Sequence, residues 1–343
     1  MKALILESYN NLIYKDFPDP EIQPDEVLVE VKACGICGSD VHGMDGSTGR
    51  RIPPVIMGHE ASGVIVSTGP LVKNWKAGDR ITFDSTIYPL DDWYTLKGQY
   101  NLSDNRKVLG VSAPDFRQHG AFAEYVAVPS YILHRLPDDV TFIQAAMVEP
   151  VAVAAHAVSL ALMKINDTVL VAGTGMIGLF IIHLLKTAGA GKIIAVDIDD
   201  KKLEMAKKYG ATHLINPQKD SVQDLILSAS MGSGADISFE VAGISQTVNI
   251  AIHGVRKGGS VILVGNLSPE VTLPLQAVVT RQIKLQGSCA ICGEYPLVLD
   301  LISNGIINVD EMISAVAPLS EGAEWFKRLY NKEPGLNKVI LVP

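Results

Sequence analysis

Two pairs of cysteines with CxxC spacing are the residues of this sequence best suited to chemistry. Cys34 and Cys37 lie in "KACGICGSDVHG", and Cys289 and Cys292 lie in "GSCAICGEY". Four thiolates can hold a structural zinc ion, and a CxxC pair can also be a redox couple when one thiol is activated. Because most of the chain separates the pairs, spacing alone does not choose between these roles.

Cys37 also belongs to a second group of candidate metal ligands. His59 and Glu60 follow the apolar stretch "PPVIMG", and Glu149 begins "EPVAV" inside an apolar segment. Thiolate, imidazole and carboxylate together suit zinc, and three protein ligands leave one position open for water or substrate. Each residue alone is more often a satisfied core histidine, a surface glutamate or an inert cysteine. A dinucleotide-binding pattern elsewhere in the chain supports the interpretation of these residues as a metal site.

That pattern follows the apolar segment "TVLVAG". Gly173, Gly175 and Gly178 form a GxGxxG sequence, with Met176 and Ile177 between the last two glycines, and an amphipathic helical stretch comes next. The first glycine permits a tight turn, the second a close approach of the backbone to a pyrophosphate, and the third close helix-to-strand packing. The helix N-terminus then faces the phosphates. We therefore predict a dinucleotide site here.

Residues further along this region suggest which dinucleotide binds. Asp197 ends the next predicted strand, "KIIAVDI", where a carboxylate bonds the adenosine ribose and repels a 2′-phosphate, so NAD is favoured over NADP. Lys202 either covers the ribose or is solvated. Val264, Gly265 and Asn266 follow a later strand, at the sheet edge where ligands of open α/β sheets bind, or they form only a turn.

Composition sets the bounds for these sites. The chain has 343 residues, enough for about two domains. It has 48% hydrophobic residues and a net charge of -8, which argues against nucleic acid as a partner. The apolar runs are too short for a membrane span or a signal peptide, and four cysteines make no disulfide scaffold. We therefore expect a cytoplasmic protein with no membrane partner.

The order of predicted elements indicates an α/β protein. Residues 1–150 mix short alternating strands with Gly and Pro turns, which predicts an irregular β domain. Residues 151–287 alternate buried strands with helices, which predicts a parallel sheet that ends with "IKLQGS". Residues 288–343 return to a mixed character.

Several segments together resemble the zinc-containing medium-chain dehydrogenases, and the sorbitol (polyol) dehydrogenase branch most closely. They are "GICGSDVH", "GHEASG", "AGDR", "LKGQYNLS", "GAFAEYV", "VEPVAV", "VAGTGMIG" and "KVILVP". The resemblance implies a GroES-like catalytic domain over 1–150, a doubly wound Rossmann domain over 151–287 and a return to the catalytic domain over 288–343.

The same resemblance assigns roles to the metal-site residues. It implies that Cys37, His59 and Glu60 bind one catalytic zinc, and that Glu149 binds the metal or holds its water. Cys34 is then a packing residue.

The resemblance further implies that Ser39 takes the alcohol proton and that His42 passes it to solvent, with Asp40 orienting the site. Without it, Ser39 would be only a turn residue and His42 only a surface residue.

The second cysteine pair falls where the family approaches the nicotinamide. Cys289, Ala290 and Ile291 would line that region, and Cys289 and Cys292 would be pocket or core thiols. The polyol branch carries an Arg-Tyr pair where this chain has Ala290 and Ile291, and often an aromatic residue in place of Gly43. Sorbitol itself is therefore a doubtful substrate.

One segment departs from the wider family, in which four cysteines often hold a second, structural zinc. Approximate alignment puts Pro89, Asp92, Thr95 and Ser103 at those positions, which predicts a single zinc per subunit.

The resulting expectation is an NAD-dependent zinc oxidoreductase that converts a secondary alcohol, such as a polyol, a cyclic polyol or a sugar-derived alcohol, to a ketone. A homo-oligomer, either a tetramer or a dimer, is expected. The alternative is an NAD-binding redox-sensing or structural relative without turnover.

Overall fold

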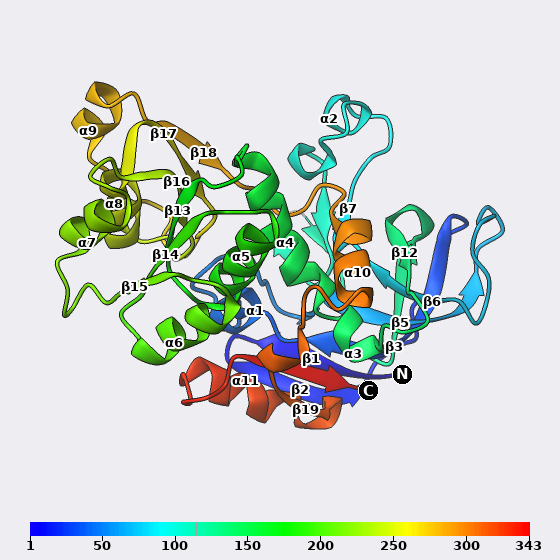
Figure 1. Cartoon of the computed structure of the whole chain (residues 1–343). Coiled ribbons are helices and arrows are strands. Elements are labelled where there is room, and N and C mark those ends of the chain that lie inside the picture. Colours follow the sequence, from blue (N-terminus) through cyan, green and yellow to red (C-terminus); the bar gives the residue numbers. More distant parts are fainter. Residues whose placement is uncertain (114–115) are drawn as a thin grey trace. The chain divides into compact units, whose positions relative to one another are not determined.

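The computed structural model describes residues 1–113 and 116–343, and the chain packs as two compact units (Figure 1). The first unit comprises Met1–Glu149 and Ile291–Pro343, and the second comprises Pro150–Ala290. The C-terminal segment thus belongs to the same unit as the N-terminal part. Within the described ranges, no helix is both long and apolar enough to cross a membrane.

The first unit is built on a mixed sheet with strand order β12-β6-β5-β3-β20-β19, to which β11 adds by pairing with β3. A smaller sheet has the order β2-β1-β4. The strands of these two sheets are β1 (Lys2–Ser8), β2 (Asn11–Asp16), β3 (Glu26–Gly35), β4 (Val55–Ile56), β5 (Glu60–Thr68), β6 (Arg80–Phe83), β11 (Tyr125–Pro129), β12 (Leu133–Arg135), β19 (Ile313–Pro318) and β20 (Lys338–Val342).

Short helices and two-residue strands complete the first unit. Its α-helices are α1 (Gly38–Gly43), α2 (Trp93–Leu96), α3 (Phe142–Ala145), α10 (Tyr295–Ser303) and α11 (Gly322–Tyr330), and 3₁₀ turns lie at Tyr100–Leu102, Ser130–Ile132, Asp310–Met312 and Leu319–Glu321. The two-residue strands are β7 (Thr86–Ile87), β8 (Lys107–Val108), β9 (Ser112–Ala113) and β10 (Phe116–Arg117). Helix α4 (Val148–Leu160) leads from the first unit into the second.

Strand β3 carries the chain to the candidate metal ligands. Val27, Val29 and Val31 are buried on one face, in the alternation expected of a half-buried strand. The alternation stops at the end of the strand, where Cys34 is 1% exposed. Burial raises the pKa of the Cys34 thiol well above its usual value, so this cysteine packs in the core as an unreactive thiol.

The second unit is a six-stranded parallel sheet with strand order β15-β14-β13-β16-β17-β18. The order reverses between β13 and β16, which is the doubly wound arrangement whose ligands bind at the carboxyl ends of the strands beside that reversal. Its strands are β13 (Thr168–Ala172), β14 (Lys192–Val196), β15 (His213–Ile215), β16 (Ala235–Glu240), β17 (Val255–Leu263) and β18 (Lys284–Gly287). The predicted parallel sheet is confirmed.

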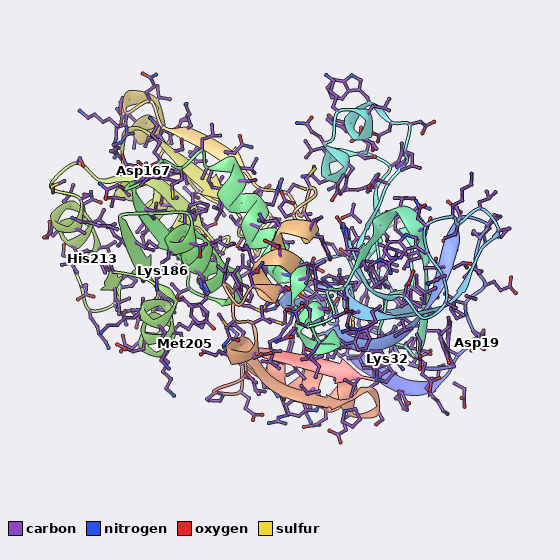
Figure 2. The ribbon with its side chains drawn as sticks, turned by 45° about the vertical axis from the view of Figure 1, so that its right-hand side comes forward. Asp19, Lys32, Asp167, Lys186, Met205 and His213 are labelled. Atoms are coloured by element: carbon purple, nitrogen blue, oxygen red, sulfur yellow. The ribbon has the colours of Figure 1, made fainter. Side chains whose placement is uncertain are left out.

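Helices connect successive strands of this sheet. They are α5 (Met176–Thr187), α6 (Asp200–Tyr209), α7 (Val222–Ala229), α8 (Ser245–Gly254) and α9 (Leu275–Thr280). In Figure 2, Asp167 marks the turn before β13, Lys186 the last turn of α5, and His213 the start of β15. A Cβ on Gly210 would lie 2.5 Å from Lys186 Cδ, so the turn after α6 lies directly against the end of α5.

Candidate active site

The structure brings three of the predicted ligands together in the first unit. One ligand atom from each of Cys37, His59 and Glu60 lies within 4.8 Å of the other two. Cys37 is the residue before α1. His59 directly precedes β5 and Glu60 is its first residue, and the pairing of β5 with β3 holds Gly35 opposite Glu60. Within the described residues, no set of four cysteines forms a metal site.

The chemistry of this group fits a divalent metal ion. His59 Nδ1 and Glu60 Oε1 are buried without a hydrogen-bond partner among the described residues, although buried polar atoms ordinarily have one. Burial, followed by the charge of Glu60, raises the pKa of Cys37 to about 12. The cysteine is therefore a neutral thiol until a metal ion displaces its proton, and zinc suits this donor set.

The fourth predicted ligand, Glu149, lies outside this three-residue group. It is in the first turn of α4. Burial raises the pKa of its carboxyl well above the usual range; the charge of His59 opposes this effect, while Glu60 and Cys37 add to it. The charges of the candidate metal ligands therefore affect Glu149. Its carboxyl would ionise readily only beside a cation.

Lys338, which the sequence did not single out, is the partner of Glu60. Its ammonium forms an ion pair with Glu60 Oε2 and donates to the Ile36 carbonyl at 3.1 Å. Burial alone would lower the pKa of Lys338, but the Glu60 charge leaves it raised. Because Lys338 occupies Oε2, Oε1 is the oxygen of Glu60 left for a metal ion. The only sequence signal was a lysine opening the terminal strand "KVILV".

The predicted proton-relay residues both lie on α1. Ser39 is exposed and donates from Oγ to Cys37 Sγ at 3.2 Å. His42 is exposed, as a group that exchanges protons with water must be. Asp40 is fully buried, and its Oδ1 lies 3.6 Å from His59 Nδ1. These contacts agree with the orienting role predicted for Asp40.

Arg51 is a second residue that sequence reasoning missed. It is 1% exposed and forms an ion pair with Asp40 at 2.8 Å. The neighbouring Arg50 is exposed, and the sequence "TGRRIPP" does not show which of the two arginines is buried.

The glycine-rich loop of the second unit has the geometry that a dinucleotide site needs. Gly173 has a φ of 101°, a conformation that favours glycine. A Cβ on Gly178 would lie 2.1 Å from the Gly173 carbonyl oxygen, whereas one on Gly175 would meet nothing within 4 Å. The third glycine therefore allows close packing, and the second faces open space at the start of α5. Met176 and Ile177 form the first turn of that helix, where backbone N–H groups lack helical partners.

Asp197 follows β14 and lies beside this loop. Its Oδ2 accepts from the Thr174 backbone N–H at 2.8 Å and from Thr174 Oγ1 at 3.1 Å, and Oδ1 accepts from the Asp199 N–H at 3.0 Å. The carboxylate is thus held in place before any ligand binds. Lys202 lies in the first turn of α6, which begins directly after Asp199.

The remaining predicted cofactor residues lie at the ends of β17 and β18. The backbone N–H groups of Val264 and Gly265 both donate to the Glu240 carbonyl, and a Cβ on Gly265 would lie 2.1 Å from Gly243 N. Close packing against Gly243 therefore explains why position 265 is a glycine, whether or not a ligand binds there. Asn266 follows it directly.

The second cysteine pair spans the boundary between the units. Cys289 and Ala290 end the second unit, with Ala290 at a φ of 51°, while Ile291 begins the last part of the first unit and is 1% exposed. Cys292 donates from Sγ to the Gly98 carbonyl at 3.0 Å, and burial raises its pKa. All four cysteines of the chain are free thiols.

Hydrogen bonds join the positions that align with the second zinc site of the wider family, where we predict no zinc. Asp92 accepts from the Thr95 backbone N–H at 2.7 Å, as the N-cap of α2, and its other oxygen accepts from Ser103 Oγ. Three of the four aligned positions are therefore in contact with one another without a thiolate.

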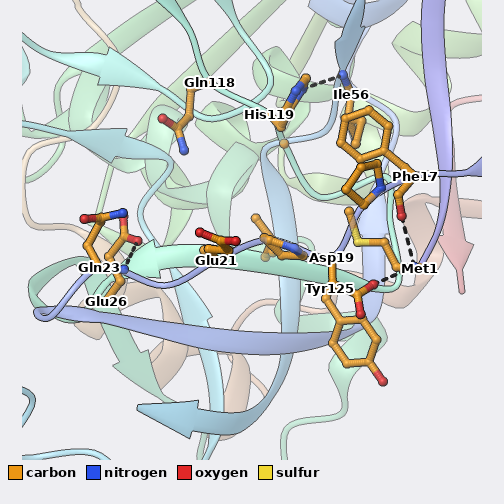
Figure 3. A pocket seen from close by; sticks show the side chains of 15 residues that line it. Met1, Phe17, Asp19, Glu21, Gln23, Glu26, Ile56, Gln118, His119 and Tyr125 are labelled. Carbon is orange, nitrogen blue, oxygen red and sulfur yellow. Dashed lines mark hydrogen bonds and ion pairs between the residues drawn. The ribbon is translucent and has the colours of Figure 1, made fainter. Parts of the chain in front are cut away.

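A separate pocket of about 340 Å³ lies elsewhere in the first unit (Figure 3). Phe17, Asp19, Glu26, His119 and Tyr125 are among the residues that line it, and none of the candidate metal ligands does. His119 Nδ1 accepts from the Ile56 backbone N–H at 3.2 Å. The pocket is thus distinct from the metal centre.

Comparison with known proteins agrees with this fold and site. Residues 23–138 match the family model of the alcohol dehydrogenase GroES-like domain, and residues 177–304 match that of zinc-binding dehydrogenases. D-xylulose reductase A from Aspergillus niger is 35% identical over 337 residues, which cover 95% of this chain and 93% of the relative.

Two solved structures are similar over the full length. A zinc-binding dehydrogenase from Sinorhizobium meliloti, solved with bound NADP, has 32% identity and a TM-score of 0.90, covering 100% of this chain and 99% of its own. The 2R,3R-butanediol dehydrogenase from Bacillus subtilis has 31% identity and a TM-score of 0.89, with the same coverage.

The two units and the metal site define a zinc- and dinucleotide-dependent oxidoreductase. The chain belongs to the zinc-binding alcohol dehydrogenase family. This membership confirms the predicted family, the GroES-like and Rossmann fold class, and zinc and a nicotinamide dinucleotide as cofactors.

Proposed function

We propose that the protein oxidises a secondary alcohol of the polyol or sugar-derived class to a ketone, with NAD as the hydride acceptor. The reaction balances as one alcohol and one NAD⁺ giving one ketone, one NADH and one proton. The observation that carries the proposal is the group of Cys37, His59 and Glu60, in which His59 and Glu60 are buried and His59 Nδ1 and Glu60 Oε1 have no hydrogen-bond partner among the described residues.

The residues of this chain suit the two proton movements that the reaction requires. Zinc, when bound, supplies Lewis-acid chemistry that lowers the pKa of an alcohol. Ser39, exposed beside Cys37, would accept the proton of the substrate hydroxyl while releasing its own hydrogen, and His42 would return that proton to water. Glu149 would be the carboxyl that responds to the charge of the site.

The substrate class rests on the relatives and on one local feature. The A. niger relative is named for D-xylulose and the B. subtilis relative for 2R,3R-butanediol, and both names point to adjacent hydroxyl or keto groups. Ala290 and Ile291, which we propose to lie near the nicotinamide with Cys289, offer no side-chain hydrogen-bond donor. We therefore favour short diols and sugar-derived alcohols over long linear polyols.

NAD is proposed over NADP because of charge at the end of β14. Asp197 lies there, and a 2′-phosphate would meet its negative charge. Lys202, Val264, Gly265 and Asn266 are the remaining residues that we propose to contact the cofactor.

The direct test combines metal analysis with a panel of diols, cyclic polyols and sugar alcohols, following NADH absorbance. Cys37→Ala should lose bound zinc and turnover but keep NAD affinity, because the glycine-rich loop belongs to the other unit. Cys292→Ser, which changes a thiol outside the metal group, is the matched control. Zinc-loaded wild type that binds NAD but oxidises no alcohol on the panel would favour the alternative, a relative without turnover.

We also propose that the protein is a homo-oligomer. All four residues of β18 are exposed, and this strand ends the parallel sheet, so its backbone is open to pairing with another copy. Light scattering after size-exclusion chromatography tests this, and a monomer at micromolar concentration would contradict it.

A further inference from the structure

The guanidinium of Arg51 is buried next to the hydroxyl that we propose to accept the substrate proton. Its Nε and Nη2 donate to Asp40 Oδ1 at 3.1 and 2.8 Å, and Nη2 also donates to Ser39 Oγ at 3.1 Å. Nη1 donates to the Arg50 carbonyl at 3.4 Å. One cation therefore contacts both Asp40, which lies beside His59, and Ser39.

The hydrogen bond from Arg51 to Ser39 leads on to Cys37, a candidate metal ligand. Ser39 Oγ accepts from Arg51 and donates its own hydrogen to Cys37 Sγ at 3.2 Å. A serine hydroxyl has one hydrogen and two lone pairs. With the hydrogen and one lone pair committed, a single lone pair of Ser39 is left, and its direction is set by Arg51 on one side and Cys37 on the other.

The fold makes specific room for Arg51. A Cβ on Gly43 would lie 2.5 Å from Arg51 Cγ, so a larger residue there would displace the arginine stem. Gly43, where the polyol branch often has an aromatic residue, therefore leaves the space that Arg51 needs. Buried ion pairs often contribute little net stability, because desolvation offsets their attraction. The pair with Asp40 therefore calls for an explanation other than stability.

We propose that Arg51 is a positioning residue that orients the Ser39 hydroxyl for proton transfer from the substrate. It acts by holding Ser39 Oγ in one hydrogen-bonding geometry between the guanidinium and Cys37, and its charge is balanced by Asp40. The expected effect on kcat rests on the proposed function. The contact between Arg51 and Ser39 should also affect Cys37, and that effect can be measured without turnover.

The experiment is a double-mutant cycle between Arg51 and Ser39, measured on the zinc enzyme and on cobalt-substituted protein. Arg51→Met should lower kcat about 10- to 100-fold, the effect of losing a charged hydrogen-bond donor, with a smaller change in KM. In cobalt protein it should shift the thiolate-to-cobalt charge-transfer band, because the Ser39 bond to Cys37 Sγ changes. Arg51→Lys should recover part of both signals.

In the Ser39→Ala background, Arg51→Met should have a much smaller further effect on kcat and on the cobalt band, because only its pair with Asp40 is then left to lose. A purely structural role would instead add its full effect in that background. Arg50→Met is the matched control, because Arg50 is the exposed neighbour.

The outcomes separate this inference from the proposed function. Additive effects in the cycle, or an Arg51→Met protein with wild-type kcat and cobalt band, would overturn the role of Arg51. If the wild type turns over no alcohol, the proposed function fails, and the cobalt arm alone decides whether Arg51 orients Ser39. If Arg51→Met does not fold, the same cycle is run with Arg51→Lys.

Discussion

Lys338 and Glu60 form an ion pair that is closed to solvent, with side-chain exposures of 0% and 1%. The two residues come from strands on either side of β3: β5 pairs with β3 through Glu60 opposite Gly35, and β20 pairs with it through Ile340 opposite Gly35. A Cβ on Gly35 would lie 2.3 Å from Glu60 Oε2 and 2.9 Å from Lys338 Cε. The glycine between the two strands therefore makes the space in which the pair forms.

Lys338→Met should destabilise the metal-free protein strongly. Removing one partner of a buried pair leaves the other charge unpaired, which typically costs about 3–5 kcal/mol. Zinc on Oε1 would supply the missing positive charge, so the loss should be smaller in the zinc-loaded form. Thermal midpoints with and without zinc measure this, with Lys327→Met on the exposed face of α11 as the control. Equal losses in both forms would show that Glu60 does not face the metal.

Stability should decrease in mild acid because of His134. This ring stacks on Tyr295 with centroids 4.8 Å apart, and burial lowers its pKa from 6.5 to about 4. Below pH 6.5 the unfolded chain takes up a proton that the folded protein does not, so stability is present above that pH and is lost as the pH falls toward 4. Between pH 7 and pH 5 this linkage should cost about 2 kcal/mol.

The variant His134→Phe keeps an aromatic ring against Tyr295 and removes the titrating group. Its thermal midpoint should therefore fall less than that of the wild type between pH 7 and pH 5, at one fixed protein concentration. His253→Phe, at an exposed position, controls for the substitution itself. Parallel pH profiles for wild type and His134→Phe would refute this assignment.

The segment around α2 should bind no metal and should depend on Asp92. We expect one zinc per chain by elemental analysis, because Asp92, Thr95 and Ser103 are joined by hydrogen bonds where thiolates would be needed. Asp92→Ala should speed amide hydrogen exchange over residues 92–103, while Asp91→Ala should not. Two zinc ions per chain, or unchanged exchange in Asp92→Ala, would be the contrary results.

Cofactor choice should depend on Asp197. Asp197→Ala removes the acceptor for the ribose hydroxyls, so NAD should bind more weakly, and it removes repulsion, so discrimination against NADP should relax. The ratio of kcat/KM for the two cofactors measures both effects. Asp200→Asn is the control, since it removes a nearby charge whose partners are Lys219 and Asn216. A wild type that prefers NADP would disprove our interpretation of Asp197.

The glycine-rich loop and the candidate metal ligands could be proposed from sequence because each depends on local chemistry. Gly173, Gly175 and Gly178 act within one turn between a strand and a helix. Cys37 and His59 could be recognised from their residue types and flanking segments, and the dinucleotide-binding pattern elsewhere in the chain supported their grouping. Local sequence also indicated the parallel sheet, because buried strands that alternate with helices have few other ways to pack.

The partners of these residues were decided by the tertiary structure. Lys338 meets Glu60 across 278 positions, through the register of β5 and β20 against β3, and Arg51 meets Ser39 because Gly43 leaves a space for its stem. Such pairs form only when strand order and register bring distant positions together, and residue type does not encode that register. The sequence therefore determined which groups could do the chemistry, and burial by the assembled sheet decided which charges surround them.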